Sequence, residues 1–510
     1  MAIYQILLTL LFIALPSILL LLLSSYRTSK GAKHTLPPGP KKLPIIGNLH
    51  QVLGPHPHQI FYNLSQKHGP LMFLQLGSIP SVVVSSSEMA REVLKTHDLD
   101  LCSRPRLVAT DRYSYNSVDV SFSPYGEYWR EMRKLFTVEL FGAKRAPIFR
   151  AIREDEMSKM IEAISRSSPS SSSSSSAPIN LSKTMVDLAN NIICRVALGK
   201  KYQEREAEDG KLQKIFNELQ VMLCSFYVED YFPSMGWIDK LRGLISRLER
   251  NVRELDAFYE QLILEHVGRE RTARSDQEDV VDALLRLSRD NKEHLTNDNI
   301  KALISDIFVA GTETAAAAMT WAVAELIKNP ELMKKAQNEV RTVVGPKGKV
   351  EEDDLPQLPY LKSVIKETFR LHPPVPLLLI HEAIRHCSIG GYDVLPRMRV
   401  YVNAWAIGRD PGTWKDPEVF NPERFTGSAI DYKGHDFELI PFGSGRRICP
   451  GMGVGSTSVE LAVANLVYSF DWELPEGMRR EEMDMEELPG MTMHKRSGLQ
   501  LVAMQHHHTA

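Results

Sequence analysis

The chain has 510 residues, of which 43% are hydrophobic and 24% are charged, which is typical of a folded protein and excludes a disordered one. Its formal net charge of −2 excludes the strongly basic face that nucleic-acid binding usually needs. The five cysteines are scattered without a Cys-x-x-Cys pair, which argues against a disulfide framework or a zinc site.

The N-terminus contains a nearly continuous apolar run from Ile3 to Leu23, long enough to cross a bilayer as a helix. It lacks the basic start and the small-residue cleavage site of a signal peptide. Basic residues follow it, so the positive-inside rule places the rest of the chain in the cytosol. We therefore predict a single membrane anchor over residues 1–25, with a cleaved targeting peptide as the alternative.

Residues 26–44 combine basic side chains with the run Leu36-Pro37-Pro38-Gly39-Pro40. Stacked prolines resist bending, so this segment predicts a stiff hinge, although a plain exposed loop would fit it equally well. No long linker divides the remainder, and we expect one large compact unit over residues 45–503. Residues 504–510 include three histidines, which we interpret as a disordered tail and not as a metal site.

Secondary structure follows from the pattern of apolar residues. Residues 71–84 predict two strands around a turn with Gly and Pro. The serine run from Ser167 to Ser176 predicts a surface loop. Short strands are expected around residues 375–405, and another helix directly after Cys449.

The longest predicted helix covers residues 297–328. Thr296 is its expected N-cap, and Asn329-Pro330 is its expected stop. Its middle is apolar almost all round, so it should cross the interior of the protein.

Cys449 lies in the segment Phe442-Gly443-Ser444-Gly445-Arg446-Arg447-Ile448-Cys449-Pro450-Gly451. Pro450 suits the first position of a helix, which would place the sulfur where backbone N–H groups favour a thiolate. The glycines would let the backbone approach a flat cofactor, and the arginines could pair with its carboxylates. A lone cysteine is more often a core residue, but these neighbours favour a metal ligand.

This segment resembles the haem-binding signature of cytochromes P450, Phe-x-x-Gly-x-Arg-x-Cys-x-Gly, and matches it at Phe442, Gly445, Arg447, Cys449 and Gly451. Three further motifs resemble the family's in the same order: Ala310-Gly311-Thr312-Glu313-Thr314, Glu367-Thr368-Phe369-Arg370 and Pro422-Glu423-Arg424-Phe425. The resemblance implies a cytochrome P450 fold, mostly α with a small β region, preceded by one transmembrane helix. Residues 123–130 look like those of plant A-type microsomal members.

The resemblance assigns roles to individual residues. Cys449 would be the axial ligand to the iron of haem b, and residues 45–503 would form the haem-thiolate catalytic domain. Phe442, Gly445, Arg447 and Gly451 would bind the cofactor around that ligand. Trp129 and Arg133, four apart on a predicted helix, would grip one haem propionate, and His381 the other. A purely structural histidine is the alternative for His381.

Glu313 and Thr314 lie in the apolar middle of the predicted long helix, where an acid needs a reason. By resemblance they are the catalytic residues that deliver protons during oxygen activation. Thr314 could instead bond back to the carbonyl of Ala310. Gly311 costs about 1 kcal/mol relative to alanine, which either a local opening of the helix or close helix packing would explain. Many relatives have a second hydroxyl residue where this chain has Ala315.

Glu367 and Arg370 share one helix face because they are three residues apart. On a surface such a pair contributes little to stability. Buried together with Arg424, it would form a hydrogen-bonded triad that fixes the core near the haem.

The predicted enzyme is a cytochrome P450 monooxygenase. It would insert one oxygen atom from O₂ into a small apolar or aromatic plant specialised metabolite. The segments expected to line its pocket are rich in apolar residues and contain few charges besides Asp111, Arg112 and Asp306: Ser103–Phe122, Ala302–Thr314, Val375–Ile380 and Leu488–Met493. A haem-thiolate lyase or dehydratase, for example one acting on an aldoxime, is the alternative. A haem sensor without turnover would need neither Glu313 nor Thr314.

Electrons must come from outside, because the sequence shows no flavin or nicotinamide motif. The resemblance implies NADPH as the indirect source, through NADPH–cytochrome P450 reductase, with cytochrome b5 as a second candidate partner. Candidate residues for the reductase-docking face are basic: Lys134, Lys144, Arg145 and Arg446. The expected location is the endoplasmic reticulum membrane, crossed once, with the catalytic domain facing the cytosol.

Overall fold

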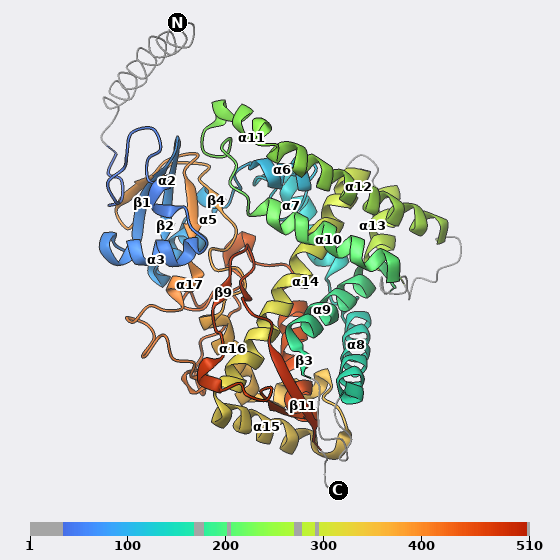
Figure 1. The fold of residues 1–510 in the computed structure, drawn as a ribbon. Coiled ribbons are helices and arrows are strands. Elements are labelled where there is room, and N and C mark those ends of the chain that lie inside the picture. The colour runs from blue at the N-terminus through green and yellow to red at the C-terminus, as the bar shows by residue number, and fades with distance from the viewer. Residues whose placement is uncertain (1–33, 168–177, 201–205, 270–277, 291–294, 507–510) are drawn as a thin grey trace, which may run out of the picture.

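The structure is a computed structural model that describes residues 34–167, 178–200, 206–269, 278–290 and 295–506. The predicted anchor over residues 1–25 lies outside these ranges, as does nearly all of the predicted serine loop. The described chain is mostly helical with a small β region, as the sequence predicts (Figure 1).

The helices differ widely in length. Those of eight residues or more are α3 (Pro57–His68), α7 (Glu127–Lys134), α8 (Ala146–Ser167), α9 (Leu181–Leu198), α10 (Glu206–Leu223), α12 (Leu244–Arg269), α13 (Val280–Asp290), α14 (Asn297–Lys328), α15 (Pro330–Val344), α16 (Pro359–Leu371) and α18 (Met452–Ser469). The shorter ones are α2 (Leu49–Val52), α4 (Ser87–Arg91), α5 (Asp98–Leu101), α6 (Val108–Tyr113), α11 (Trp237–Leu241) and α17 (Ala404–Ile407).

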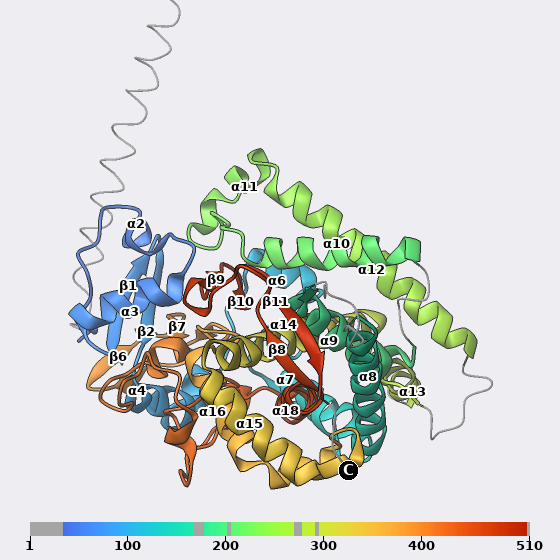
Figure 2. The same cartoon turned by 60° about the horizontal axis from the view of Figure 1, so that its bottom comes forward.

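The central element is α14, and its predicted bounds are confirmed. The side chain of Thr296 caps it by accepting from the N–H of Asn299, and Asn329-Pro330 follows its last residue. The helix packs against α9, α16 and α18 (Figures 1 and 2). Among the described helices it alone is long and apolar enough to cross a membrane. Because most of its residues are buried inside the protein, that composition is the one expected for a core helix.

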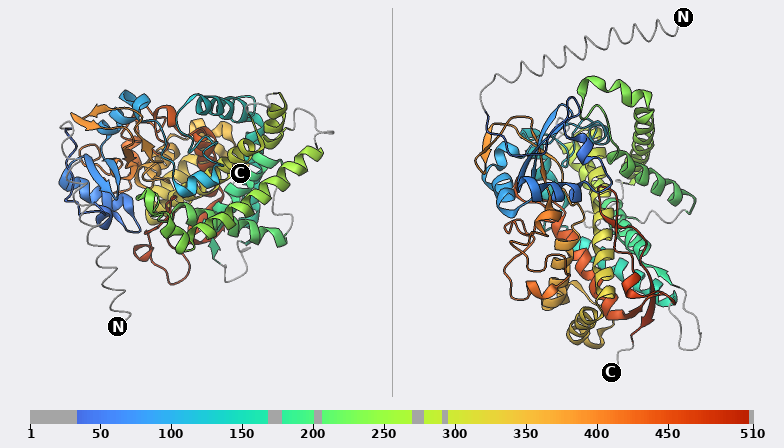
Figure 3. Two further views of the ribbon diagram at one scale, coloured as in Figure 1. Left: turned by 90° about the horizontal axis from the view of Figure 1, so that it is seen from above. Right: turned by 60° about the vertical axis from the view of Figure 1, so that its left-hand side comes forward.

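The β region lies to one side of the helices (Figure 3). Its main sheet has the order β1-β2-β7-β4, in which β2 and β7 run parallel. Its strands are β1 (Leu71–Leu76), β2 (Ile79–Val84), β4 (His381–Glu382) and β7 (Arg399–Val402). A hairpin of β5 (Cys387–Ile389) and β6 (Tyr392–Val394) follows β4 in sequence. Both strand regions expected from the sequence, residues 71–84 and 375–405, are therefore confirmed.

Two smaller sheets use the end of the chain. One has the order β3 (Ile179–Asn180), β11 (Gln500–Gln505) and β8 (Phe470–Glu473). The other is the hairpin of β9 (Glu487–Leu488) and β10 (His494–Lys495), and β10 packs against α14. The predicted tail boundary at residue 504 is two residues early, because Gln505 still pairs with Phe470 in the sheet.

The proline-rich segment is part of the fold and does not form a free hinge. The N–H of Phe73 in β1 donates to Pro38 at 2.9 Å, and the N–H of Asp393 donates to Thr35 at 2.8 Å. A Cβ on Gly39 would lie 2.1 Å from the carbonyl oxygen of Phe73, so only glycine allows this approach. From Thr35 onward, backbone hydrogen bonds therefore fix this part of the predicted 26–44 hinge against the β region.

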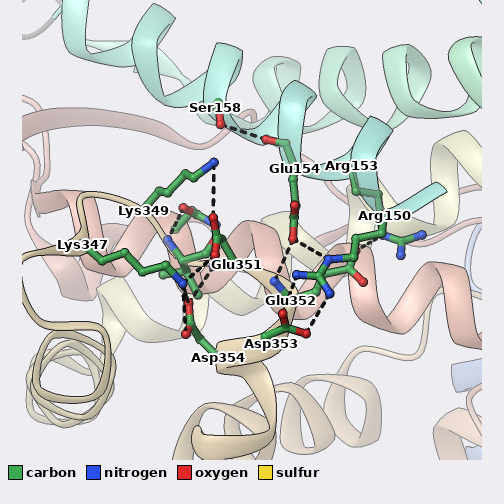
Figure 4. A network of polar contacts seen from close by, with 12 residues as sticks. Arg150, Arg153, Glu154, Ser158, Lys347, Lys349, Glu351, Glu352, Asp353 and Asp354 are labelled. Carbon is green, nitrogen blue, oxygen red and sulfur yellow. Dashed lines mark hydrogen bonds and ion pairs between the residues drawn. The ribbon is translucent and has the colours of Figure 1, made fainter. Parts of the chain in front are cut away.

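A network of ion pairs connects α8 to the turn before α16 (Figure 4). Arg150 of α8 forms two hydrogen bonds with Asp353, at 2.7 and 2.8 Å, and Arg153 donates to Glu352 at 2.6 Å. The N–H of Glu352 also donates to the Glu154 carboxylate. These contacts join the outer helix α8 to the layer that contains α15 and α16.

Candidate active site

Cys449 lies in a tight loop between a short 3₁₀ turn and α18. Its N–H donates to the carbonyl of Phe442 at 2.9 Å, which closes the loop around Gly443 and Gly445. Gly445 has φ +70°, and a Cβ there would lie 2.2 Å from the carbonyl oxygen of Leu94. Gly445 thus allows the loop to pack against its neighbour, and it does not line the cavity described below.

The helix after Cys449 begins later than the sequence suggested. Met452 is its first residue and Gly451 its N-cap, so Pro450 is not at the first helical position. Burial raises the pKa of the Cys449 thiol, and the N–H of Gly451 and the charge of Arg133 oppose that effect. Burial outweighs the helix terminus, because a thiolate loses its hydration there. A thiolate at this position therefore needs a further positive partner, such as a metal ion.

A cavity of about 290 Å³ lies over Cys449. Each of the four predicted pocket segments contributes to it, through residues such as Phe122, Ala310, Val375 and Met491. Helices α9 and α10, which we did not include, also line it, with Ala189, Ile192, Ile193, Leu219 and Leu223. Most of these side chains are apolar, which fits a ligand that is itself apolar or aromatic.

Three arginines line this cavity, Arg104, Arg133 and Arg447. Arg447 donates to the carbonyls of Cys102 and Ser123, at 2.8 and 2.7 Å, and Arg104 donates to that of Leu379 at 2.6 Å. Burial lowers the pKa of Arg447 to about 10 and that of Arg104 well below its usual range. Among the described residues, no carboxylate forms an ion pair with any of the three, which is unusual for the two that are buried, Arg104 and Arg447, because buried charges are normally paired.

Arg104 was missed by the sequence reasoning, although it lies in a segment predicted to line the pocket. The periodicity of a loop says nothing about where one side chain points. The segment contains other charged residues, such as Arg106 and Asp111, so the charge of Arg104 alone gave no distinguishing signal.

Trp129 lies behind one of the arginines, whereas His381 lines the cavity beside them. Trp129 is buried, donates to the carbonyl of Val120 at 2.9 Å and lies under the Arg447 guanidinium, 4.0 Å from its centre. It does not line the cavity, so it supports Arg447 from behind. His381 does line the cavity, with Nδ1 3.1 Å from the carbonyl of Leu101. Burial, reinforced by Arg104 and Arg447, lowers the pKa of His381 well below its usual value.

The motif on α14 divides between two sides of the helix. Thr314 lines the cavity, and its hydroxyl donates to Ala310 at 2.6 Å, as the structural alternative predicted. Glu313 does not line the cavity and instead contacts His494 of β10, with 2.6 Å between Oε2 and Nε2. The helix is continuous at Gly311, where a Cβ would lie 2.5 Å from Ile193 Cδ1. Close packing against α9, and not a local opening, accounts for this glycine.

Two buried acids meet at the cavity wall. Asp306 accepts from the N–H of Val120 at 2.8 Å, and Asp119 accepts from the N–H of Phe122 at 3.0 Å. Burial, followed for Asp119 by repulsion from Asp306, raises both pKa values. Asp119 was missed because its neighbours in sequence show no pattern. Asp111 and Arg112 face elsewhere, toward Arg106 and Glu249.

The predicted triad is present and buried. Glu367 accepts from Arg370 at 2.6 and 2.8 Å and from Arg424 at 2.9 Å. Arg370 also donates to the carbonyls of Gly408 and Pro417, so α16 is fastened to the loops that lead to Cys449.

The basic residues proposed for docking do not all reach the surface. Arg145 is buried and forms an ion pair with Glu278 at 2.7 Å, so it is wrong as a docking residue. Lys134 and Lys144 are exposed, and Arg446 is partly exposed beside Asp98.

Comparison with known proteins identifies the family. A family model described as Cytochrome P450 matches residues 37–502. Cytochrome P450 71A9 of Glycine max is 50% identical over 92% of this chain and 93% of its own length. Strychnine-11-hydroxylase of Strychnos nux-vomica is 46% identical, over 92% and 91%. A zebra fish cytochrome P450 structure with abiraterone superposes with a TM-score of 0.75 at 26% identity, covering 89% of this chain and 99% of that one.

The family match and the site agree with each other. The buried arginines without carboxylate partners suit a flat ligand that carries two carboxylates, which describes haem b, and the thiol of Cys449 suits an iron ligand. The chain therefore belongs to the cytochrome P450 family and is a haem monooxygenase.

Proposed function

We propose that this enzyme hydroxylates a small apolar or aromatic plant metabolite within the cavity over Cys449. The observation that carries the proposal is the combination of one thiol and three arginines, which have no carboxylate ion pair among the described residues, around a largely apolar space. Cys449 would bind the iron, and Arg104, Arg133 and Arg447 would bind the propionates with His381 beside them. When bound, haem b supplies the oxidising chemistry, and a thiolate ligand favours cleavage of the O–O bond.

The protein's own residues prepare that chemistry. The apolar walls from α9, α14 and residues 375–379 would exclude water and orient the substrate. Thr314 would hold a proton donor at the cavity, and Glu313 would resupply it from the other side of the helix. Phe442 and Gly451 line the cavity next to Cys449 and would pack against the cofactor.

The relatives support a plant small molecule as the substrate. One of them is named as an 11-hydroxylase of strychnine. In this chain the cavity wall has Phe122, Leu223, Val309 and Met491, which would contact a rigid, largely apolar ring system.

The electron source would be NADPH through NADPH–cytochrome P450 reductase, with cytochrome b5 as a second donor. Lys134, Lys144 and Arg446 are the remaining candidates for its docking face. We place the enzyme at the endoplasmic reticulum membrane, crossed once by residues 1–25. In support, exposed apolar residues flank α2 and lie on α11, at the same end of the molecule (Figures 1 and 2): Leu43, Ile45, Leu53, Trp237 and Leu241.

The test is Thr314→Ala on a substrate found by a spectral binding screen of plant metabolites. Loss of the hydroxyl should lower product per NADPH and release peroxide, because a positioned proton donor contributes about 10²–10⁴-fold. Thr312→Ala is the matched control, since Thr312 is on the same helix but does not line the cavity. Unchanged coupling in Thr314→Ala, with product formed without oxygen, would refute monooxygenation and support a lyase.

A further inference from the structure

A second cavity, of about 340 Å³, adjoins α14 at Thr320, in the C-terminal half of the helix. It shares no lining residue with the cavity over Cys449, and its wall is largely polar: Asn180, Ser182, Lys183, Asp187, Thr320 and His494. Because α14 borders both cavities, this helix separates a polar, partly open space from the apolar site.

His494 connects the second cavity to the motif on α14. Its Nε2 lies 2.6 Å from Oε2 of Glu313, and the two side chains are 23% and 21% exposed. That nitrogen is shielded from solvent, and it makes no aligned hydrogen bond in the observed geometry although the Glu313 carboxylate lies within reach of one. Glu313 is its only ionic partner among the described residues.

A second histidine–glutamate pair on α14 shows what a purely structural contact looks like. His372 meets Glu325 at 2.7 Å, and both side chains are buried. The ring of His372 stacks on Trp321 with 4.0 Å between centroids, which fixes it in place. His494 has no such ring contact among the described residues and lines the second cavity, and the Glu313 carboxylate beside it is partly exposed to solvent.

We propose that His494 is a positioning residue that holds the Glu313 carboxylate at the second cavity. The inference rests on the proposed role of Glu313 in proton delivery. Glu313 does not itself line this cavity but is partly exposed beside His494, which does. It takes a proton from solvent water there, turns toward Thr314 and gives the proton up. The carboxylate then returns to His494. Each proton passed to the apolar side is replaced by one from solvent, so charge balances over the cycle.

The experiment uses the full-length holoenzyme with reductase, NADPH and dioxygen, without added substrate. The readout is the fraction of consumed NADPH that is recovered as hydrogen peroxide. His494→Leu should raise that fraction about threefold or more, a smaller effect than the 10²–10⁴-fold of a proton donor itself. Glu313→Gln should raise it at least as much, and the double variant should raise it no further than Glu313→Gln alone.

His494→Gln tests positioning directly, because its amide still donates to a carboxylate but carries no charge. It should restore at least half of the difference between wild type and His494→Leu. If it behaves like His494→Leu, the ring itself is required and positioning is refuted. His372→Gln, normalised to correctly folded haem protein, is the matched control and should leave the peroxide fraction unchanged.

The outcomes separate this inference from the proposed function. If Glu313→Gln leaves the peroxide fraction unchanged, the proton-delivery role fails. If Glu313→Gln raises it and His494→Leu does not, only the positioning role fails. Hydrogen exchange gives a readout without turnover: backbone amides of residues 487–495 should exchange faster in His494→Leu and in Glu313→Gln, but not in His494→Gln. Unchanged exchange in His494→Leu would show that the contact does not hold β10 to α14.

Discussion

The arginines and the cysteine that line the cavity have no oppositely charged ion-pair partner among the described residues. A buried arginine normally has a carboxylate beside it, because a charge loses its hydration when it leaves water. Among the described residues, the hydrogen bonds of Arg104, Arg133 and Arg447 all go to backbone carbonyls, and none of the three forms an ion pair with a carboxylate. The same reasoning applies to Cys449, whose buried thiol has a raised pKa until a positive partner is supplied.

Cys449→Ala should therefore remove the thiolate state of the haem protein. The cavity and its arginines remain, so some haem binding survives. The reduced, CO-bound variant should lose the red-shifted Soret band of thiolate ligation. Cys102→Ala is the matched control, because Cys102 is another buried cysteine that does not line the cavity. A retained red-shifted band in Cys449→Ala would exclude Cys449 as the ligand.

Asp119 and Asp306 predict a dependence of stability on pH. Folding raises both pKa values, so the folded state binds more protons than the unfolded chain above about pH 4. Their stabilising contribution is thus complete below the unfolded pKa. It is lost as the pH rises through the raised, folded-state values.

Asp306→Asn should reduce the loss of stability that accompanies rising pH. An asparagine can still accept from the N–H of Val120 and can donate to Asp119, while the repulsion between two carboxylates disappears. The thermal midpoint of the holoprotein, measured from acidic to alkaline pH, should fall less steeply in the variant than in the wild type. Asp298→Asn, at the exposed first turn of the same helix, should keep the wild-type slope. Equal slopes in wild type and Asp306→Asn would show that these two acids do not set the pH dependence of stability.

At the scale of elements, α14 shows how far the sequence could predict. Its bounds follow from local chemistry, a Thr296 cap and an Asn-Pro stop, and were predicted correctly. The reason for Gly311 depends on Ile193, which is more than 100 residues away, and the partner of Glu313 is His494 in β10. Contacts of this kind depend on tertiary packing, which a sequence pattern within one helix cannot predict.

The start of α18 shows the same limit at shorter range. Pro450 fits a first helical position, yet the loop first closes through the hydrogen bond from Cys449 to Phe442. The helix therefore begins at Met452. The Glu367 triad was predictable because each of its parts is a short motif, and only its burial required the structure.

Glu367→Gln tests the triad. It keeps the shape of the side chain but leaves Arg370 and Arg424 without a buried counter-charge, which should cost about 3–5 kcal/mol of unfolding free energy. Chemical unfolding of the holoprotein gives the measurement. Glu423→Gln, which loses only an exposed pair with Lys335, should change it by about 0.5 kcal/mol or less. Equal effects of the two variants would show that the triad contributes no more than a surface pair.

At the scale of the whole molecule, the layout separates three environments. The polar second cavity, the apolar site and the exposed apolar residues near α2 and α11 lie in different parts of the fold. The described chain is fixed from Thr35 onward by hydrogen bonds to the β region, so an N-terminal anchor would be joined to the body with little slack. Such a connection would keep one end of the molecule toward the membrane.

Deleting residues 1–25 should release most of the protein from membranes while haem stays bound, because every residue around Cys449 lies beyond the deletion. The measurements are sedimentation with membranes and the spectrum of the reduced, CO-bound form. Exposed apolar residues are expected to leave some residual binding, since Ile45 and Trp237 are 59% and 56% exposed. Adding Trp237→Ser and Leu241→Ser to the deletion should abolish this residual membrane binding. Val138→Ser, which removes an equally exposed apolar side chain elsewhere, should not. Loss of haem on deletion would mean that residues 1–25 belong to the core. Membrane binding that survives all of these changes would refute both the N-terminal anchor and the apolar residues of α11 as membrane contacts.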